Sequence, residues 1–128
     1  MKYNSKSKIL IVDDERLNIS IVAEILNQEY DLLVATNGEK VYQIVAADRK
    51  PDLILLDIVM PGISGFEVAQ ELKKNPETLH IPIIFLTAKH EMRVSSKDLI
   101  WVLSISSLNR FKKRSFWLES KIRFRYII

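Results

Sequence analysis

Three short apolar runs, each followed at once by a residue able to bind a cation or a phosphoryl group, constrain the fold of this chain more than any other feature. Residues 8–12 lead into Asp13 and Asp14, residues 53–56 into Asp57, and residues 83–86 into Thr87. Runs of this length are typical of buried strands in a parallel sheet. Stretches of helical period separate them, and we therefore predict an α/β fold of repeated strand–helix units.

The residues at the ends of these runs are expected to meet in one pocket. In an open α/β sheet, the carboxyl ends of neighbouring parallel strands lie at one edge, where such sheets bind ligands. Carboxylates packed closely raise one another's pKa unless a cation lies among them, and hard divalent cations prefer oxygen ligands. The sequence therefore predicts a divalent-metal site formed by Asp13, Asp14 and Asp57 beside Thr87.

Helical spacing and turn residues predict the elements between these strands. Residues 17–26 predict a first helix whose apolar stripe belongs to the core, and residues 31–35 predict a second strand. A turn at residues 37–38 precedes a second helix, and Ser64 or Gly65 is expected to cap a third. The buried face of this third helix is expected to hold Phe66, Val68, Ala69 and Leu72.

The composition is that of a single globular domain without disulfides. A chain of 128 residues that is 48% hydrophobic suffices for one core, and it contains no cysteine. Residues 1–8 hold no apolar signal segment, and the longest apolar runs are too short to span a bilayer. We therefore expect a cytoplasmic protein that makes no contact with a membrane.

Charge is unevenly distributed along the chain. Residues 1–92 hold 10 Lys and Arg against 14 Asp and Glu, a net charge of −4, whereas residues 93–128 hold 9 against 2, a net charge of +7. Beyond Arg93 the chain also loses both helical and strand periodicity. We therefore divide it into an N-terminal extension over 1–7, a domain over 8–92 and an atypical basic tail over 93–128.

Three stretches in this order and at these spacings resemble the receiver domain of two-component response regulators, the phosphoacceptor module of bacterial signalling. They are ILIVDDE at 9–15, PDLILLDIVMPGISG at 51–65 and IPIIFLTAK at 81–89. The resemblance covers about residues 8–91. It implies a flavodoxin-like, three-layer α/β/α fold with a parallel sheet of strand order 2-1-3-4-5, and a truncated receiver domain over residues 8–92.

The resemblance also implies roles for the clustered residues. Asp57 would be the phosphoacceptor, and Asp14 and Asp57 would bind Mg²⁺ directly. The backbone carbonyl of Val59 would be a further ligand, Asp13 would reach the metal through water, and Thr87 would hydrogen-bond the phosphoryl group. The donor would be the phosphohistidine of a sensor histidine kinase, so the domain promotes its own phosphorylation and is not otherwise an enzyme.

The C-terminal part of the sequence departs from the family. Receiver domains have a Lys-Pro pair at the end of a fifth strand, whereas the one such pair here is Lys50-Pro51. Residues 101–111 can be encoded by codons that in another frame read Leu-Gly-Ala-Val-Asp-Phe-Ile-Thr-Lys-Pro-Phe, similar to the family's fifth strand and turn. We hypothesise a reading-frame change near Arg93. The nucleotide sequence of codons 90–128 tests this hypothesis, and an alternate frame that encodes no Lys-Pro turn would refute it.

Loss of the lysine has structural and functional consequences. Alternating residues over 101–106 allow a makeshift fifth strand, but the sequence specifies neither its register nor a last helix. The phosphoryl group would lack one of its counter-charges. We therefore expect Mg²⁺ binding to survive, while phosphorylation is weak and switching is impaired.

A second class of function is also compatible with the sequence. The runner-up is a pseudo-receiver that acts by protein contact alone, or a non-functional truncated remnant.

Basic and aromatic residues at 110–117 resemble a nucleic-acid patch, but a frame change produces this composition by accident, so we do not expect nucleic-acid binding. The adjacent Asp13 and Asp14 exclude a haloacid-dehalogenase-type phosphatase, which separates its aspartates by one residue, and an acidic first turn excludes a glycine-rich nucleotide loop. The sequence does not indicate an oligomeric state.

Overall fold

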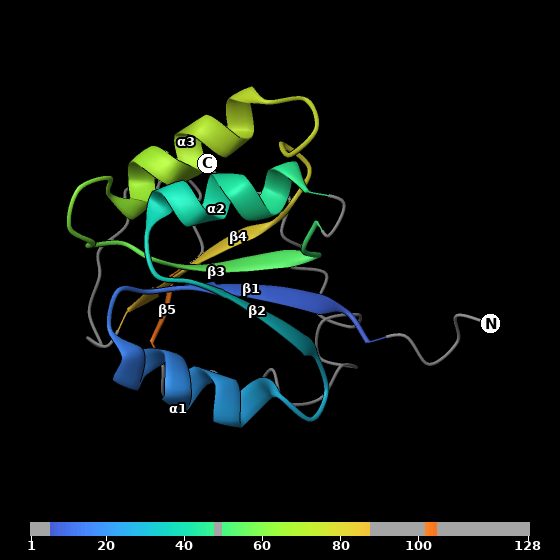
Figure 1. The fold of residues 1–128 in the computed structure, drawn as a ribbon, viewed down its shortest axis with the longest axis vertical. Helices are drawn as coiled ribbons and strands as arrows, with labels where there is room; N and C mark the ends of the chain where they lie inside the picture. Colours follow the sequence, from blue (N-terminus) through green and yellow to red (C-terminus); the bar gives the residue numbers. More distant parts are fainter. Residues whose placement is uncertain (1–5, 48–49, 88–101, 105–128) are drawn as a thin grey trace.

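The computed structural model describes residues 6–47, 50–87 and 102–104. A parallel sheet forms the middle layer, with α1 on one face and α2 and α3 on the other (Figure 1). This arrangement confirms the predicted three-layer α/β/α fold.

Within the described residues, the sheet has five strands in the order β2-β1-β3-β4-β5, all parallel. Their bounds are Lys8–Val12 for β1, Asp31–Ala35 for β2, Leu53–Asp57 for β3, Ile83–Thr87 for β4 and Val102–Ser104 for β5. The short β5 pairs with β4, with Leu86 opposite Leu103, in the segment where the sequence allows a makeshift strand. The flavodoxin-like strand order is therefore confirmed.

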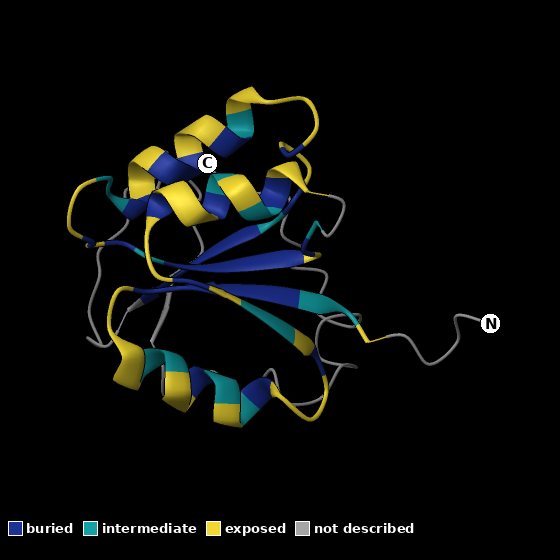
Figure 2. Cartoon of the chain, viewed as in Figure 1, coloured by how far each residue is buried: buried dark blue, intermediate teal, exposed yellow. Residues whose placement is uncertain are grey.

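The central strands are buried on both faces, as their unbroken apolar sequences predict (Figure 2). Alternate residues point to opposite sides because side chains in a strand have a period of two. In β1, Leu10 and Val12 pack with α2 and α3, whereas Ile9 and Ile11 pack with α1. The two cores hold the sheet rigidly, and a rigid sheet positions the residues at its carboxyl edge.

Helix α1 (Arg16–Leu26) forms where predicted, but its buried face differs from the prediction. Val22 and Leu26 are buried, whereas Leu17 is 70% exposed and Ile21 is 40% exposed. Residues 22 and 26 lie one turn apart on the side toward the sheet, and residues 17 and 21 lie one turn apart on an adjoining face. The prediction that the whole stripe is core was wrong, because one flat sheet covers only one of these faces.

Asn37 and Gly38, predicted as a turn, form the start of α2 (Gly38–Ala46). Asn37 is the N-cap, and its side-chain oxygen accepts a hydrogen bond of 2.8 Å from the backbone N–H of Lys40. Asn37 therefore lies in a bend as predicted, whereas Gly38, predicted to belong to the turn, is already helical, because asparagine favours turns and helix caps through the same local hydrogen bond.

Helix α3 (Gly65–Lys74) begins with a capping box. The Ser64 hydroxyl accepts a hydrogen bond from the Glu67 N–H, and the Glu67 carboxylate accepts one from the Ser64 N–H. Val68, Ala69 and Leu72 are buried as predicted. Phe66, predicted to be buried, is 39% exposed, although its ring packs against that of Phe85 with 4.9 Å between centroids.

Replacing Ser64 with alanine is expected to lower the free energy of unfolding by about 1 kcal/mol, because the cap of α3 is lost. Urea unfolding followed by circular dichroism measures this change. Ser20→Ala is the control, since Ser20 is exposed in the middle of α1 and alanine there has the higher helix propensity. Equal stability changes in the two variants would contradict a stabilising role for the cap.

None of the helices in the described part of the chain is long and apolar enough to cross a membrane. Most of the predicted basic tail lies outside the described residues, as do residues 1–5 of the N-terminal extension.

Candidate metal centre

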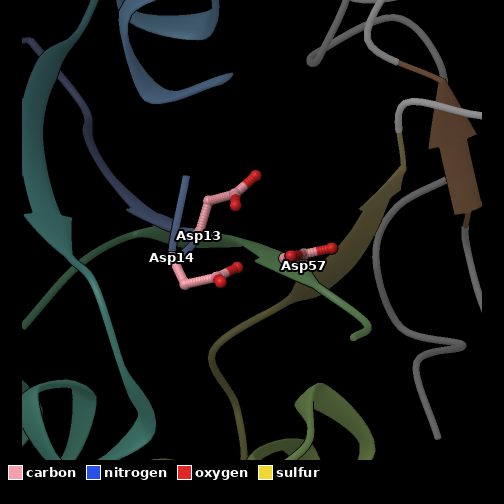
Figure 3. Close-up of side chains that lie close together, drawn as sticks. All are labelled: Asp13, Asp14 and Asp57. Atoms are coloured by element: carbon pink, nitrogen blue, oxygen red, sulfur yellow. The ribbon is translucent and has the colours of Figure 1, made fainter. Parts of the chain in front are cut away.

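Parallel register brings three aspartates to one edge of the sheet. Val12 pairs with Leu56, so the next residues, Asp13 and Asp57, lie side by side at the ends of β1 and β3. Asp57 in turn pairs with Leu86, so the backbone of Thr87 lies one residue further along β4. Figure 3 shows the side chains of Asp13 and Asp14 at the end of β1 beside that of Asp57 at the end of β3.

The three carboxylates form a compact cluster. One oxygen from each of Asp13, Asp14 and Asp57 lies within 4.8 Å of the others. The burial of the three side chains is graded: Asp13 is 6% exposed, Asp57 is half-buried and Asp14 is exposed. The cluster is therefore buried at Asp13 and open to solvent at Asp14.

Burial and neighbouring charge raise the pKa of Asp57 to about 7. Desolvation is the largest cause, followed by the negative charge of Asp13, a hydrogen bond with the Asp13 side chain and the charge of Asp14, while a hydrogen bond from the Val59 backbone lowers the pKa. Near neutral pH, Asp57 therefore carries a proton in a large fraction of molecules.

This donor set fits a hard divalent cation. Such ions bind carboxylate oxygens, and three of these converge here from two strands. A cation among them would also remove the repulsion that raises the pKa of Asp57. The predicted convergence of Asp13, Asp14 and Asp57 is confirmed, while their individual roles remain predictions.

Asp13 is held by the start of α1, a detail that the sequence pattern did not predict. One oxygen of Asp13, Oδ1, accepts a hydrogen bond of 2.9 Å from the Glu15 N–H, and Oδ2 accepts one of 3.2 Å from Asn18 Nδ2. The sequence signal for this contact was Asn18, an asparagine in the first turn of the predicted helix that follows the acidic pair.

The loop from β3 to α3 passes very close to Asp57. The Gly65 N–H donates a hydrogen bond of 2.8 Å to the Ile58 carbonyl, and a Cβ at Gly65 would overlap the Asp57 carbonyl oxygen. Only glycine fits here without a shift of the backbone. The sequence predicted Gly65 only as a possible helix cap and gave no sign of this packing role.

Val59 and Thr87 lie after and at the end of their strands, respectively. Val59 follows β3 with a side chain that is 79% exposed, and its backbone contributes a hydrogen bond to Asp57. Thr87 is the last residue of β4. The predicted metal contact of the Val59 carbonyl and the predicted phosphoryl contact of Thr87 remain predictions.

Comparison with known proteins finds similarity to response regulator sequences and structures. A model of the response regulator receiver domain matches residues 9–100. The chain is 49% identical over 84 residues to the phosphate regulon transcriptional regulatory protein PhoB of Pseudomonas aeruginosa, covering 65% of this chain and 36% of that protein. It is 36% identical over 96 residues to protein PilH of Pseudomonas aeruginosa, covering 74% of this chain and 75% of PilH.

A solved structure of the Mn(2+)-bound form of response regulator Rcp1 has the same fold. It superposes with a TM-score of 0.67 at 26% identity, covering 89% of this chain and 96% of that chain. The chain spans 18% to 36% of the length of three of the curated relatives it matches, PhoB among them. The comparison therefore concerns the receiver portion of these longer proteins.

Proposed function

Because the chain belongs to the family of response regulator receiver domains, we propose that it accepts a phosphoryl group from a histidine kinase onto Asp57 with the help of Mg²⁺. Receiver domains are signalling domains that take phosphoryl groups from histidine kinases. The observation that carries the proposal is the convergence of three carboxylates at the carboxyl edge of a parallel sheet. This is the place at which open α/β sheets bind ligands.

Receiver domains bind Mg²⁺ at an acidic pocket, and this chain offers such a pocket. Asp14 and Asp57 would bind the ion directly, the Val59 carbonyl would add a ligand and Asp13 would act through water. The related response regulator Rcp1 has been solved in a Mn²⁺-bound form, which supports a divalent-cation site in this domain. When bound, the ion would screen the negative charges of the carboxylates and the phosphoryl group.

Asp57 is the nucleophile in the proposed transfer. One of its carboxylate oxygens forms a bond to phosphorus while the bond between phosphorus and the kinase histidine nitrogen breaks, and the electron pair of that bond stays on the imidazole. The rigid β3 holds the carboxylate in place, and the Thr87 hydroxyl would hydrogen-bond the transferred group. The added charge of roughly −1.5 to −2 would then bias a two-state surface.

In our proposal, the absence of a Lys-Pro pair at the end of the fifth strand makes this receiver a weak phosphoacceptor. One positive counter-charge of the phosphoryl group is absent, so phosphorylation is slow and switching is impaired. The same observation supports the second candidate, a pseudo-receiver that works by protein contact alone or a non-functional remnant. Domain limits of 8–92 for the receiver and 93–128 for the basic tail belong to this proposal.

Phosphorylation by a small donor tests the proposal directly. The chain, incubated with acetyl phosphate and Mg²⁺, is expected to show a slowly forming shifted band on a Phos-tag gel. Omitting Mg²⁺ or adding EDTA should prevent the shift. A chain that is folded and monomeric by circular dichroism and sedimentation, yet shows no shift, would support the pseudo-receiver instead.

Mg²⁺ affinity is expected to rise with pH up to about pH 7 and to level off above it. The pKa of Asp57 is raised to about 7, so below this pH the ion must displace a proton from the carboxylate that binds it. The expected slope is about tenfold per pH unit below pH 7. Calorimetric titration between pH 5.5 and 8.5 measures it, and an affinity independent of pH would contradict the role of Asp57 as a ligand.

The proposed location is the cytoplasm, because phosphohistidine is formed from ATP by the kinase domains that supply receivers. The donor kinase is specified only by its chemistry, as one that carries a phosphohistidine.

A further inference from the structure

Asp13 is the most buried carboxylate of the cluster, and besides its hydrogen bond with Asp57 it accepts two from residues outside the cluster. Its two oxygens accept one bond each, from the Glu15 N–H at 2.9 Å and from Asn18 Nδ2 at 3.2 Å. Glu15 is the N-cap of α1 but caps no backbone group with its own side chain. Asp13 therefore takes over the role of hydrogen-bond acceptor at the start of α1.

Only one of these two bonds depends on the identity of a side chain. Any residue other than proline at position 15 supplies a backbone N–H. The bond from residue 18 needs a side-chain donor at the right reach, and the amide of Asn18 must turn its NH₂ group toward Asp13 because an ionised carboxylate only accepts. Asn18 lies outside the acidic cluster and contributes no negative charge to it.

We propose that Asn18 is a positioning residue for the metal centre, which acts by holding the Asp13 carboxylate in one orientation. The inference rests on the proposed function, since it concerns the same Mg²⁺ site. Hydrogen-bond partners behind a ligand set typically matter by 10–100-fold in metal affinity. Asn18 links α1 to this site through Asp13.

Asn18→Leu tests the proposal, because leucine has a similar size and no donor. Calorimetric titration of the full chain with Mg²⁺ at pH 7.5 is expected to show an affinity about tenfold lower than that of the unsubstituted chain. Asn18→Ala, which improves helix propensity, is expected to show a similar loss and serves if the leucine variant does not fold. Asn27→Leu is the matched control, because Asn27 is exposed at the other end of α1 and makes only a backbone hydrogen bond to the described residues.

Thermal unfolding in EDTA separates positioning from simple stability. If Asn18 only stabilises α1, the variants unfold at a lower temperature in EDTA but bind Mg²⁺ as tightly as the unsubstituted chain, and the inference is overturned. If the unsubstituted chain itself binds no Mg²⁺, the proposed function fails and the role of Asn18 fails with it. A loss of affinity in both Asn18 variants, without one in Asn27→Leu, supports the inference.

Discussion

Asp57→Asn is expected to abolish phosphorylation of the chain completely. The amide cannot form an acyl phosphate, and neither Asp13 nor Asp14 sits at the end of the central strand β3 that presents Asp57. The measurement is a Phos-tag gel after incubation with acetyl phosphate or a histidine kinase in the presence of Mg²⁺. The unsubstituted chain is expected to react slowly, so a long time course is needed for both proteins.

The same substitution is expected to leave the fold intact or to stabilise it without metal. It removes a carboxylate whose burial, and then the charges of Asp13 and Asp14, raise its pKa to about 7. Thermal unfolding in EDTA provides this control, because a higher or equal midpoint excludes misfolding as the cause of lost activity. A Mg²⁺-dependent shifted band in Asp57→Asn would show that another residue accepts the phosphoryl group. Rapid, complete phosphorylation of the unsubstituted chain would instead refute the proposed impairment.

Gly65→Ala is expected to destabilise the fold more than alanine at either of the other two glycines, Gly38 and Gly62. The new Cβ would overlap the Asp57 carbonyl oxygen and would lie 3.0 Å from the Ile58 Cα, and both are backbone atoms. Relief therefore requires a shift of the loop or of β3. We expect the free energy of unfolding to fall by about 3 kcal/mol, at the upper end of overpacking effects, and Mg²⁺ affinity to fall because Asp57 moves.

Gly62→Ala is the matched control for this experiment. Gly62 has a φ of 79°, and among the described residues no atom lies within 4 Å of the place its Cβ would take, so its substitution tests backbone conformation alone. The left-handed region is unfavourable for alanine by about 1–2 kcal/mol. Urea unfolding of both variants measures the difference. A Gly65→Ala protein no less stable than Gly62→Ala would contradict the steric role of Gly65.

The strands were predictable because each carries its own signal. Short apolar runs that are followed at once by Asp13 or Asp57 already imply buried parallel strands and a polar edge. The start of α2 was predicted less well, because Asn37 favours a turn and an N-cap equally until its hydrogen bond to Lys40 is known. The exposure of Leu17 was not predictable, because an apolar residue beside the buried face of a helix has no local mark of its orientation.

The sequence by itself determined the α/β class, the strand positions and the set of residues from which the site is built. These follow from local periodicity and from the rule that parallel strands end at a common edge. Only the tertiary structure decided the raised pKa of Asp57, the hydrogen bond from Asn18 to Asp13 and the close approach of Gly65 to β3. Each depends on ångström-scale distances between side chains or backbone atoms from different elements or turns, and such distances are set by packing rather than by sequence pattern.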